Sequence, residues 1–184
     1  CGEGAQMQLR RSRLKFSRLN HIFISHLHGD HCFGLLGLIS TLNLLGRTAE
    51  LHIHSPKGLE TLLTPMLDFF NRQMTYKVLF HEFDTKEPMQ IYEDRSLTVT
   101  TIPLRHRMPC CGFLFAEKRR PNHIIREMVD FYQVPVYELN RIKNGADYVT
   151  PEGKTVSNNL LTRPSAPSRS YAYCSDTAFH PSII

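Results

Sequence analysis

The sequence predicts an α/β fold that carries a metal site at the edge of a β-sheet. Residues 26–31 hold three histidines and one aspartate within six consecutive positions. An apolar run over residues 21–24 leads into this stretch, and a glycine-punctuated apolar segment over residues 32–39 follows it. An apolar strand, a polar loop and an apolar helix in this order place the loop where a strand ends. With 184 residues and 41% hydrophobic content, the chain is long enough for one domain with a substantial core.

The pattern of apolar residues predicts the remaining elements in order. Period-two alternation marks the strands, and apolar residues at helical spacing mark the helices. Gly46 is expected to end the central helix, because glycine readily adopts the left-handed conformation found after a helix. Residues 179–181 are expected to start a further helix, with proline at its first position. We expect helices at residues 2–13, 31–45 and 59–73, and strands at residues 21–25, 50–54, 76–83, 90–92, 97–103, 113–116 and 171–174.

His26 and His28 are the first candidate metal ligands. Histidines one residue apart on an extended backbone point to the same side, so both can bind one ion. Gly29 lets the chain turn and direct Asp30 and His31 at a neighbouring point. Imidazole and carboxylate ligands together suit Zn²⁺ or a similar divalent ion. The alternative, a polar loop with surface histidines, does not explain four such residues at this spacing between two apolar elements.

A second His-x-His pair, His52 and His54, lies in the next predicted strand. No Asp-His follows it, and Pro56 ends the strand. Because alternation along one strand face explains the pair, we do not expect either histidine to bind a metal. His81, in the following strand, is expected to be a surface polar residue.

The chain is basic, with a formal net charge of +5 and a pI of about 9.0. A basic balance favours a polyanionic partner, although many basic proteins bind no nucleic acid. The five cysteines include no Cys-x-x-Cys, and Cys110 and Cys111 are adjacent, so a reducing cytoplasm fits best. No apolar run approaches the length of a membrane span and no signal peptide is visible, so we expect no membrane partner.

Residues 117–169 differ in character from the rest of the chain. They are rich in charge, proline and asparagine and poor in long apolar runs, with nine basic and six acidic residues. A segment this long without strong apolar periodicity is usually functional or disordered when it lies inside a compact domain. The alternatives are an inserted binding arm and a simple surface insertion.

The motif at residues 25–31, Ser-His-Leu-His-Gly-Asp-His, resembles the signature of the metallo-β-lactamase superfamily at every position. With the Gly-Leu-Leu-Gly-Leu of residues 34–38, it is similar to the form found in the ribonuclease Z family. The resemblance implies a four-layer αββα sandwich, incomplete in this chain. We expect an internal piece of a longer protein, because the family normally has an Asp before a Cys-Gly-Glu-Gly such as the one at Cys1. Residues 1–184 are then a partial metallo-β-lactamase domain, and residues 117–169 resemble an inserted arm that grips tRNA.

The same resemblance implies further site residues. The family takes a ligand from a strand-end histidine shortly before a Gly-aromatic pair, and His106 before residues 112–113 matches it. Asp176, in a Ser-Asp-Thr sequence, matches a carboxylate that bridges two metals. Asp30 is the expected proton acceptor, because it lies beside the nucleophile and stays ionised near cations. The implied ligands are His26, His28, His106 and Asp176 for the first metal, and Asp30, His31, Asp176 and a histidine outside this chain for the second.

The family resemblance implies a zinc-dependent endoribonuclease that matures tRNA 3′ ends by hydrolysing a phosphodiester of precursor tRNA. Two divalent ions per subunit, expected to be Zn²⁺, would activate water and offset charge on the phosphate. The resemblance also implies a cytoplasmic homodimer in which the arm of one subunit holds the tRNA cut by the other. Two alternatives stay open. One is another hydrolase of the same fold, such as a small phosphodiesterase or a glyoxalase II-like thioesterase, and the other is a non-catalytic RNA-binding fragment.

Overall fold

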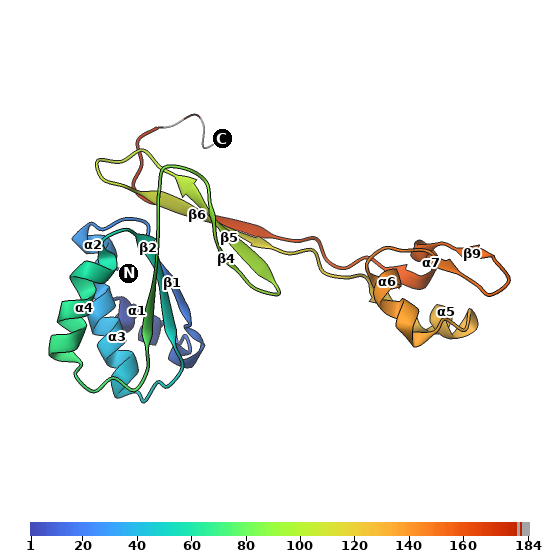
Figure 1. Ribbon diagram of the computed structural model, residues 1–184, viewed down its shortest axis with the longest axis horizontal. Coiled ribbons are helices and arrows are strands. Elements are labelled where there is room, and N and C mark those ends of the chain that lie inside the picture. Colours follow the sequence, from blue (N-terminus) through green and yellow to red (C-terminus); the bar gives the residue numbers. More distant parts are fainter. Residues whose placement is uncertain (180, 182–184) are drawn as a thin grey trace. The chain divides into compact units, whose positions relative to one another are not determined.

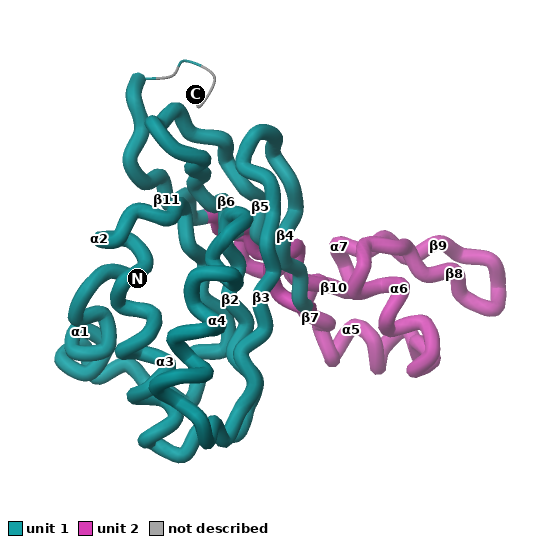
Figure 2. The backbone as a smooth tube through the Cα atoms, turned by 60° about the vertical axis from the view of Figure 1, so that its left-hand side comes forward, with its two compact units in different colours: residues 1–94, 98–115, 171–184 teal, residues 95–97, 116–170 magenta. Residues whose placement is uncertain are grey.

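The computed structural model describes residues 1–179 and 181, and these form two compact units (Figure 2). The first unit comprises residues 1–94, 98–115 and the chain from residue 171 onward. The second unit comprises residues 95–97 and 116–170. Each unit has a buried hydrophobic cluster of its own.

A parallel sheet positions the candidate site in the first unit. Its strand order is β1-β2-β3, and neighbouring strands run parallel. Its strands are β1 (His21–Phe23), β2 (Leu51–Pro56) and β3 (Val78–Phe83). Alternate residues of the sheet, such as Ile22 and Ile53, are buried in one cluster with apolar residues of the helices. The helices on this face are α1 (Ala5–Arg11), α3 (Gly34–Leu44) and α4 (Leu59–Phe70) (Figure 1).

A second sheet lies against the other face of the first. Its strand order is β11-β6-β5-β4, and β4 and β5 form the predicted antiparallel hairpin. Aromatic side chains lie between the sheets, because the ring of Phe113 is 5.6 Å from that of Phe23 and 6.2 Å from that of Phe83. Helices, sheet and sheet are three of the four expected layers, and they confirm the α/β fold class. The strands are β4 (Gln90–Glu93), β5 (Leu97–Pro103), β6 (Cys111–Glu117) and β11 (Ser170–Tyr173).

The second unit folds around a small core of its own. Its two ends meet where the Arg169 guanidinium pairs with the Glu117 carboxylate at 2.6 Å, and these hydrogen bonds lower the pKa of Glu117 to about 2. The core residues are Val129, Val134, Ile142, Tyr148, Val156 and Leu161. The elements are β7 (His123–Ile124), α5 (Arg126–Phe131), the 3₁₀ turn Val136–Glu138, α6 (Leu139–Lys143), β8 (Tyr148–Val149), β9 (Thr155–Val156), α7 (Asn158–Leu161) and β10 (Thr162–Arg163).

The segment after the metal motif differs from the single helix predicted over residues 31–45. It forms two helices, α2 (Gly29–Cys32) and α3. Gly34 lets the backbone of Gly2 pass directly against the start of α3, because a Cβ at Gly34 would overlap the Gly2 carbonyl oxygen. Gly46 follows α3 with φ 74°, as predicted. His180, expected at a helix start, lies outside the described residues, and none of the described helices has the length and apolarity needed to cross a membrane.

Four histidines gather on the face of the first sheet that is turned toward the second. His21 Nδ1 lies 3.2 Å from His54 Nε2, and His52 Nδ1 lies 2.9 Å from His81 Nε2. The rings of His21 and His52 stack at 4.7 Å, and those of His54 and His81 stack at 4.8 Å. Burial, and then the neighbouring imidazoles, lower the pKa of His54 to about 3. Burial and then neighbouring imidazoles also lower the pKa of His21 and that of His81, which favours the neutral form of these rings. His81 is exposed, as predicted, and its ring is also bonded to that of His52.

The free energy of unfolding is expected to fall as the pH drops below about 6.5. The unfolded state takes up a proton at His54 near its ordinary pKa, whereas the folded state resists it down to a pKa of about 3. Between these values the loss is about 1.4 kcal/mol per pH unit. Urea unfolding at a series of pH values should show a shallower dependence for His54→Gln than for the wild type. His123→Gln, which removes an exposed histidine of the second unit, is the control, and an equal pH dependence in all three proteins would contradict the prediction.

Candidate metal centre

The turn that follows β1 is fixed by both sheets immediately before the metal motif. Ile24 N–H donates to a carbonyl oxygen of β2 at 2.8 Å and extends the β1–β2 pairing by one residue. The next carbonyl, that of Ser25, accepts a hydrogen bond from the N–H of Cys111 at 3.0 Å, where β6 begins. Hydrogen bonds from both sheets therefore fix the backbone immediately before His26.

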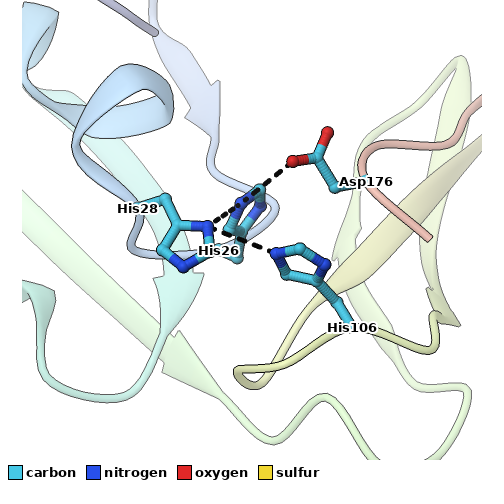
Figure 3. A group of neighbouring side chains, drawn as sticks. All are labelled: His26, His28, His106 and Asp176. Carbon is cyan, nitrogen blue, oxygen red and sulfur yellow. Dashed lines mark hydrogen bonds and ion pairs between the residues drawn. The ribbon is translucent and has the colours of Figure 1, made fainter. Parts of the chain in front are cut away.

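The structure brings four of the predicted ligands together (Figure 3). One side-chain atom each from His26, His28, His106 and Asp176 lies within 4.8 Å of all the others. His28 Nδ1 is 3.2 Å from His26 Nε2 and also 3.2 Å from His106 Nε2. One ring nitrogen carries at most one proton, so hydrogen bonding alone does not explain both contacts. Nitrogens bound to one tetrahedral zinc ion lie about 3.3 Å apart, which fits this spacing.

Asp30 and His31 lie beside this cluster, in α2. His31 Nε2 is 3.5 Å from Asp30 Oδ2 and 3.7 Å from Asp176 Oδ2. The same Asp176 oxygen is 3.9 Å from His26 Nε2. Asp176 thus lies between two adjacent groups of ligands, a position from which one carboxylate can serve two neighbouring ions.

Hydrogen bonds on both sides hold Asp176 next to His106. The Arg105 N–H donates to Thr177 Oγ1 at 3.1 Å. In return, the Ala178 N–H donates to the carbonyl oxygen of Arg105 at 2.8 Å. The two site residues are therefore aligned through their neighbours, although nearly the whole second unit separates them in sequence.

Two buried side chains that the sequence did not single out as site residues contact His26. Ser25 Oγ lies 3.0 Å from His26 Nδ1, and Cys110 Sγ lies 3.6 Å from the same nitrogen. Cys110 Sγ also donates to the main-chain carbonyl of Asp176 at 3.6 Å. Burial raises the pKa of the Cys110 thiol to about 11, so the thiol keeps its proton as a donor. The only signal in the sequence was position, because Ser25 is the first residue of the motif and Cys110 follows His106 closely.

The electrostatics of the site favour metal binding. His26 is fully buried, and burial followed by the neighbouring histidines lowers its pKa. A neutral imidazole is the form that ligates a metal, so little proton displacement is needed at neutral pH. Three imidazoles with carboxylates are ligands that suit Zn²⁺ and similar divalent ions. The residues present therefore fit a divalent metal.

Comparison with known families agrees with this geometry. The family described as "Beta-lactamase superfamily domain" matches residues 1–124. The chain belongs to the β-lactamase superfamily. Its helices and paired sheets are those of the metallo-β-lactamase fold, which implies the use of divalent metal. The His/Asp cluster of this chain offers side chains of the type that bind such an ion.

Curated relatives named Ribonuclease Z match the chain throughout, which confirms the resemblance predicted from the motif. The relative from Bacteroides fragilis (strain YCH46) is 79% identical over all 184 residues, and that from Porphyromonas gingivalis (strain W83) is 52% identical. The chain spans 60% of the length of each. The solved structure of human tRNase Z, short form, is 32% identical with a TM-score of 0.58, over 64% of this chain and 51% of that one.

Replacing His28 by alanine is expected to lower the metal content of the full-length protein, because His28 Nδ1 lies at the centre of the three-histidine contact. Elemental analysis of the purified protein measures the metal-to-protein ratio. His52→Ala is the matched control, since it removes a histidine from the other His-x-His pair, outside the cluster. A ratio equal to that of the wild type in His28→Ala would remove His28 from the site.

Proposed function

We propose that the protein is an endoribonuclease that matures tRNA 3′ ends by hydrolysing a phosphodiester of precursor tRNA. The observation that carries this proposal is the gathering of His26, His28, His106 and Asp176 in a chain similar over its full length to ribonuclease Z. Because the chain spans 60% of the length of that relative, the activity is proposed for the whole protein.

We propose that the site residues form two adjacent groups, each of which binds one divalent ion, and that both ions are zinc. Bound ions would supply Lewis acidity and an activated water at neutral pH. The contacts of one Asp176 oxygen with both groups support a bridging role for this carboxylate. The first ion takes His26, His28, His106 and Asp176, and the second takes Asp30, His31, Asp176 and a histidine outside this chain.

Asp30 is the proposed proton acceptor of the reaction. Its side chain is 73% exposed and lies 3.5 Å from His31 Nε2, at the open side of the site. Neighbouring cations keep a carboxylate ionised, which is the form that accepts a proton. Ser25 and Cys110 act differently, because they hold the ring of His26 in the orientation that turns Nε2 toward the cluster.

The second unit is the proposed tRNA-binding arm. Residues 117–169 carry nine basic and six acidic residues. Among the described residues 117–169, four exposed cations pair with no carboxylate, and they are free to contact phosphates. A hydrolase of small thioesters or phosphodiesters needs no such unit. The four cations are Arg119, Lys143, Lys154 and Arg163.

We further propose that the protein acts as a homodimer in the cytoplasm. On α4, Leu62, Met66, Phe69 and Phe70 are between 46% and 66% exposed. A contiguous apolar surface favours association with another protein, and a second copy of the chain is the proposed occupant. All five cysteines are free thiols, which supports a reducing compartment.

Incubation of the full-length protein with precursor tRNA tests the proposed activity. We expect cleavage that leaves a 3′-hydroxyl on the tRNA body, loss of cleavage on chelation, and recovery on addition of Zn²⁺. A glutathione thioester and a small phosphodiester are the comparison substrates. Thioester hydrolysis without RNA cleavage would favour the glyoxalase II-like alternative, and tRNA binding without any hydrolysis would identify a non-catalytic RNA-binding protein.

A further inference from the structure

A pocket of about 560 Å³ opens beside the metal cluster, within the first unit. His106 forms part of its wall, so one of the proposed metal ligands is shared between the pocket and the centre. The pocket is built from chain segments at the carboxyl ends of three strands. Each segment begins with the last residue of its strand: residues 56–57 for β2, residues 83–86 for β3, and residues 103–110 for β5.

Four exposed cations surround the pocket: Lys57, Lys86, Arg105 and Arg107. Over residues 1–179 and 181, none of the four forms an ion pair with a carboxylate. Asp84 is the single acidic residue of the lining, and its Oδ1 accepts the main-chain N–H of Lys86 at 2.9 Å. The pocket thus has a large excess of positive charge, which favours a polyanionic ligand.

The lining between these cations is mainly apolar. Phe83 and Pro56 are buried in the wall, and Leu104 and Met108 are half-buried. Bases of single-stranded nucleic acid pack against apolar and aromatic surfaces, while their phosphates contact flanking cations. The pocket has the volume of a small-ligand site, enough for about one or two nucleotides and too small for a duplex.

We propose that this pocket binds the single-stranded RNA next to the scissile phosphate. Bases lie against the apolar wall, and phosphodiesters contact Lys57, Lys86, Arg105 and Arg107. The proposal rests on the proposed function, because that function places RNA at the metal centre. Two segments of precursor tRNA offer such unpaired bases and phosphodiesters: the 3′ trailer and the unpaired 3′ end of the tRNA body.

The test uses full-length protein in which all four cations are replaced by alanine. Dissociation constants for a short oligouridylate and for mature tRNA are measured over a series of salt concentrations. For oligouridylate, the slope of log affinity against log salt should become shallower by about 0.7 for each phosphate that the variant no longer neutralises, and by up to about 2.8 for four. The matched control replaces the same number of exposed cations elsewhere on the first unit: Lys15, Arg18, Arg72 and Lys77.

The control variant should keep the wild-type slope of log affinity against log salt. A double variant, Lys57→Ala with Arg107→Ala, should show about half of the decrease in slope that the fourfold variant shows. The double variant provides the test if the fourfold variant folds poorly. Competition distinguishes the two segments. If oligouridylate still binds the wild type in the presence of saturating mature tRNA, the pocket holds the trailer. If mature tRNA displaces oligouridylate, the pocket holds the 3′ end of the tRNA body. Wild-type affinity and slope in both pocket variants would overturn the proposal. Failure of the wild type to cleave precursor tRNA is a separate result that overturns the proposed function.

Discussion

Replacing Asp30 by alanine is expected to lower kcat for precursor tRNA by a factor of at least about 10²–10⁴, while the Kd for the same RNA stays nearly unchanged. The substitution removes the proposed proton acceptor and a proposed metal ligand together. Because the side chain is 73% exposed, its loss leaves no cavity in the core. Single-turnover cleavage by the full-length protein, measured beside Kd, separates the chemical step from binding.

Two further variants make this result specific. Asp30→Asn keeps the shape of the side chain but removes its capacity to accept a proton, so it should also be slow. Asp68→Ala removes an exposed carboxylate from α4 in the same unit and should cleave at the wild-type rate. Single-turnover cleavage near the wild-type rate in Asp30→Ala would exclude Asp30 as the proton acceptor.

Replacing most of the second unit by a short Gly-Ser linker is expected to weaken binding of precursor tRNA strongly. The linker replaces residues 118–168 and keeps the Glu117–Arg169 ion pair that joins the two ends of the segment. The slope of log affinity against log salt should become shallower by about 0.7–0.9 for each phosphate that the arm would otherwise neutralise. Hydrolysis of a small chromogenic phosphodiester should survive, because all six proposed site residues lie in the first unit.

A milder variant controls for damage to the fold. Alanine at the unpaired cations Arg119, Lys143, Lys154 and Arg163 leaves the core of the second unit intact and should reproduce part of the decrease in affinity. Unchanged tRNA affinity and salt slope in both variants would make the second unit a surface insertion without a binding role. Loss of both activities in the linker variant alone would make the unit structural.

The order of the strands and helices in the first unit could be predicted from the sequence, because each has its own apolar period. The break between α2 and α3 could not, since it depends on the backbone of Gly2, which lies far from Gly34 in sequence. The fold of the second unit could not be predicted from the sequence either. Its core joins residues such as Val129, Ile142 and Leu161, which come from separate short elements, and none of those elements is long enough to show periodicity.

For the candidate site, too, local spacing predicted some residues and could not predict those that chain folding brings together. The spacing of residues 26–31 predicted that the side chains of His26 and His28 lie on one side of the chain, and their nearest ring nitrogens are 3.2 Å apart. His106 and Asp176 could be named only through a family resemblance, since chain folding alone brings them near. The contact between Cys110 and His26 had no sequence signal beyond proximity to His106, because it depends on how the two sheets meet.

The hydrogen bond from Cys111 N–H to the Ser25 carbonyl joins the two sheets one residue before His26. His26 and His28 follow a strand of the first sheet, whereas His106 follows a strand of the second. Sliding of one sheet over the other would therefore change the separation of these three ligands. An ion bound by all three of these proposed ligands would therefore fix the alignment of the two sheets, and its affinity would depend on how well the sheets are assembled.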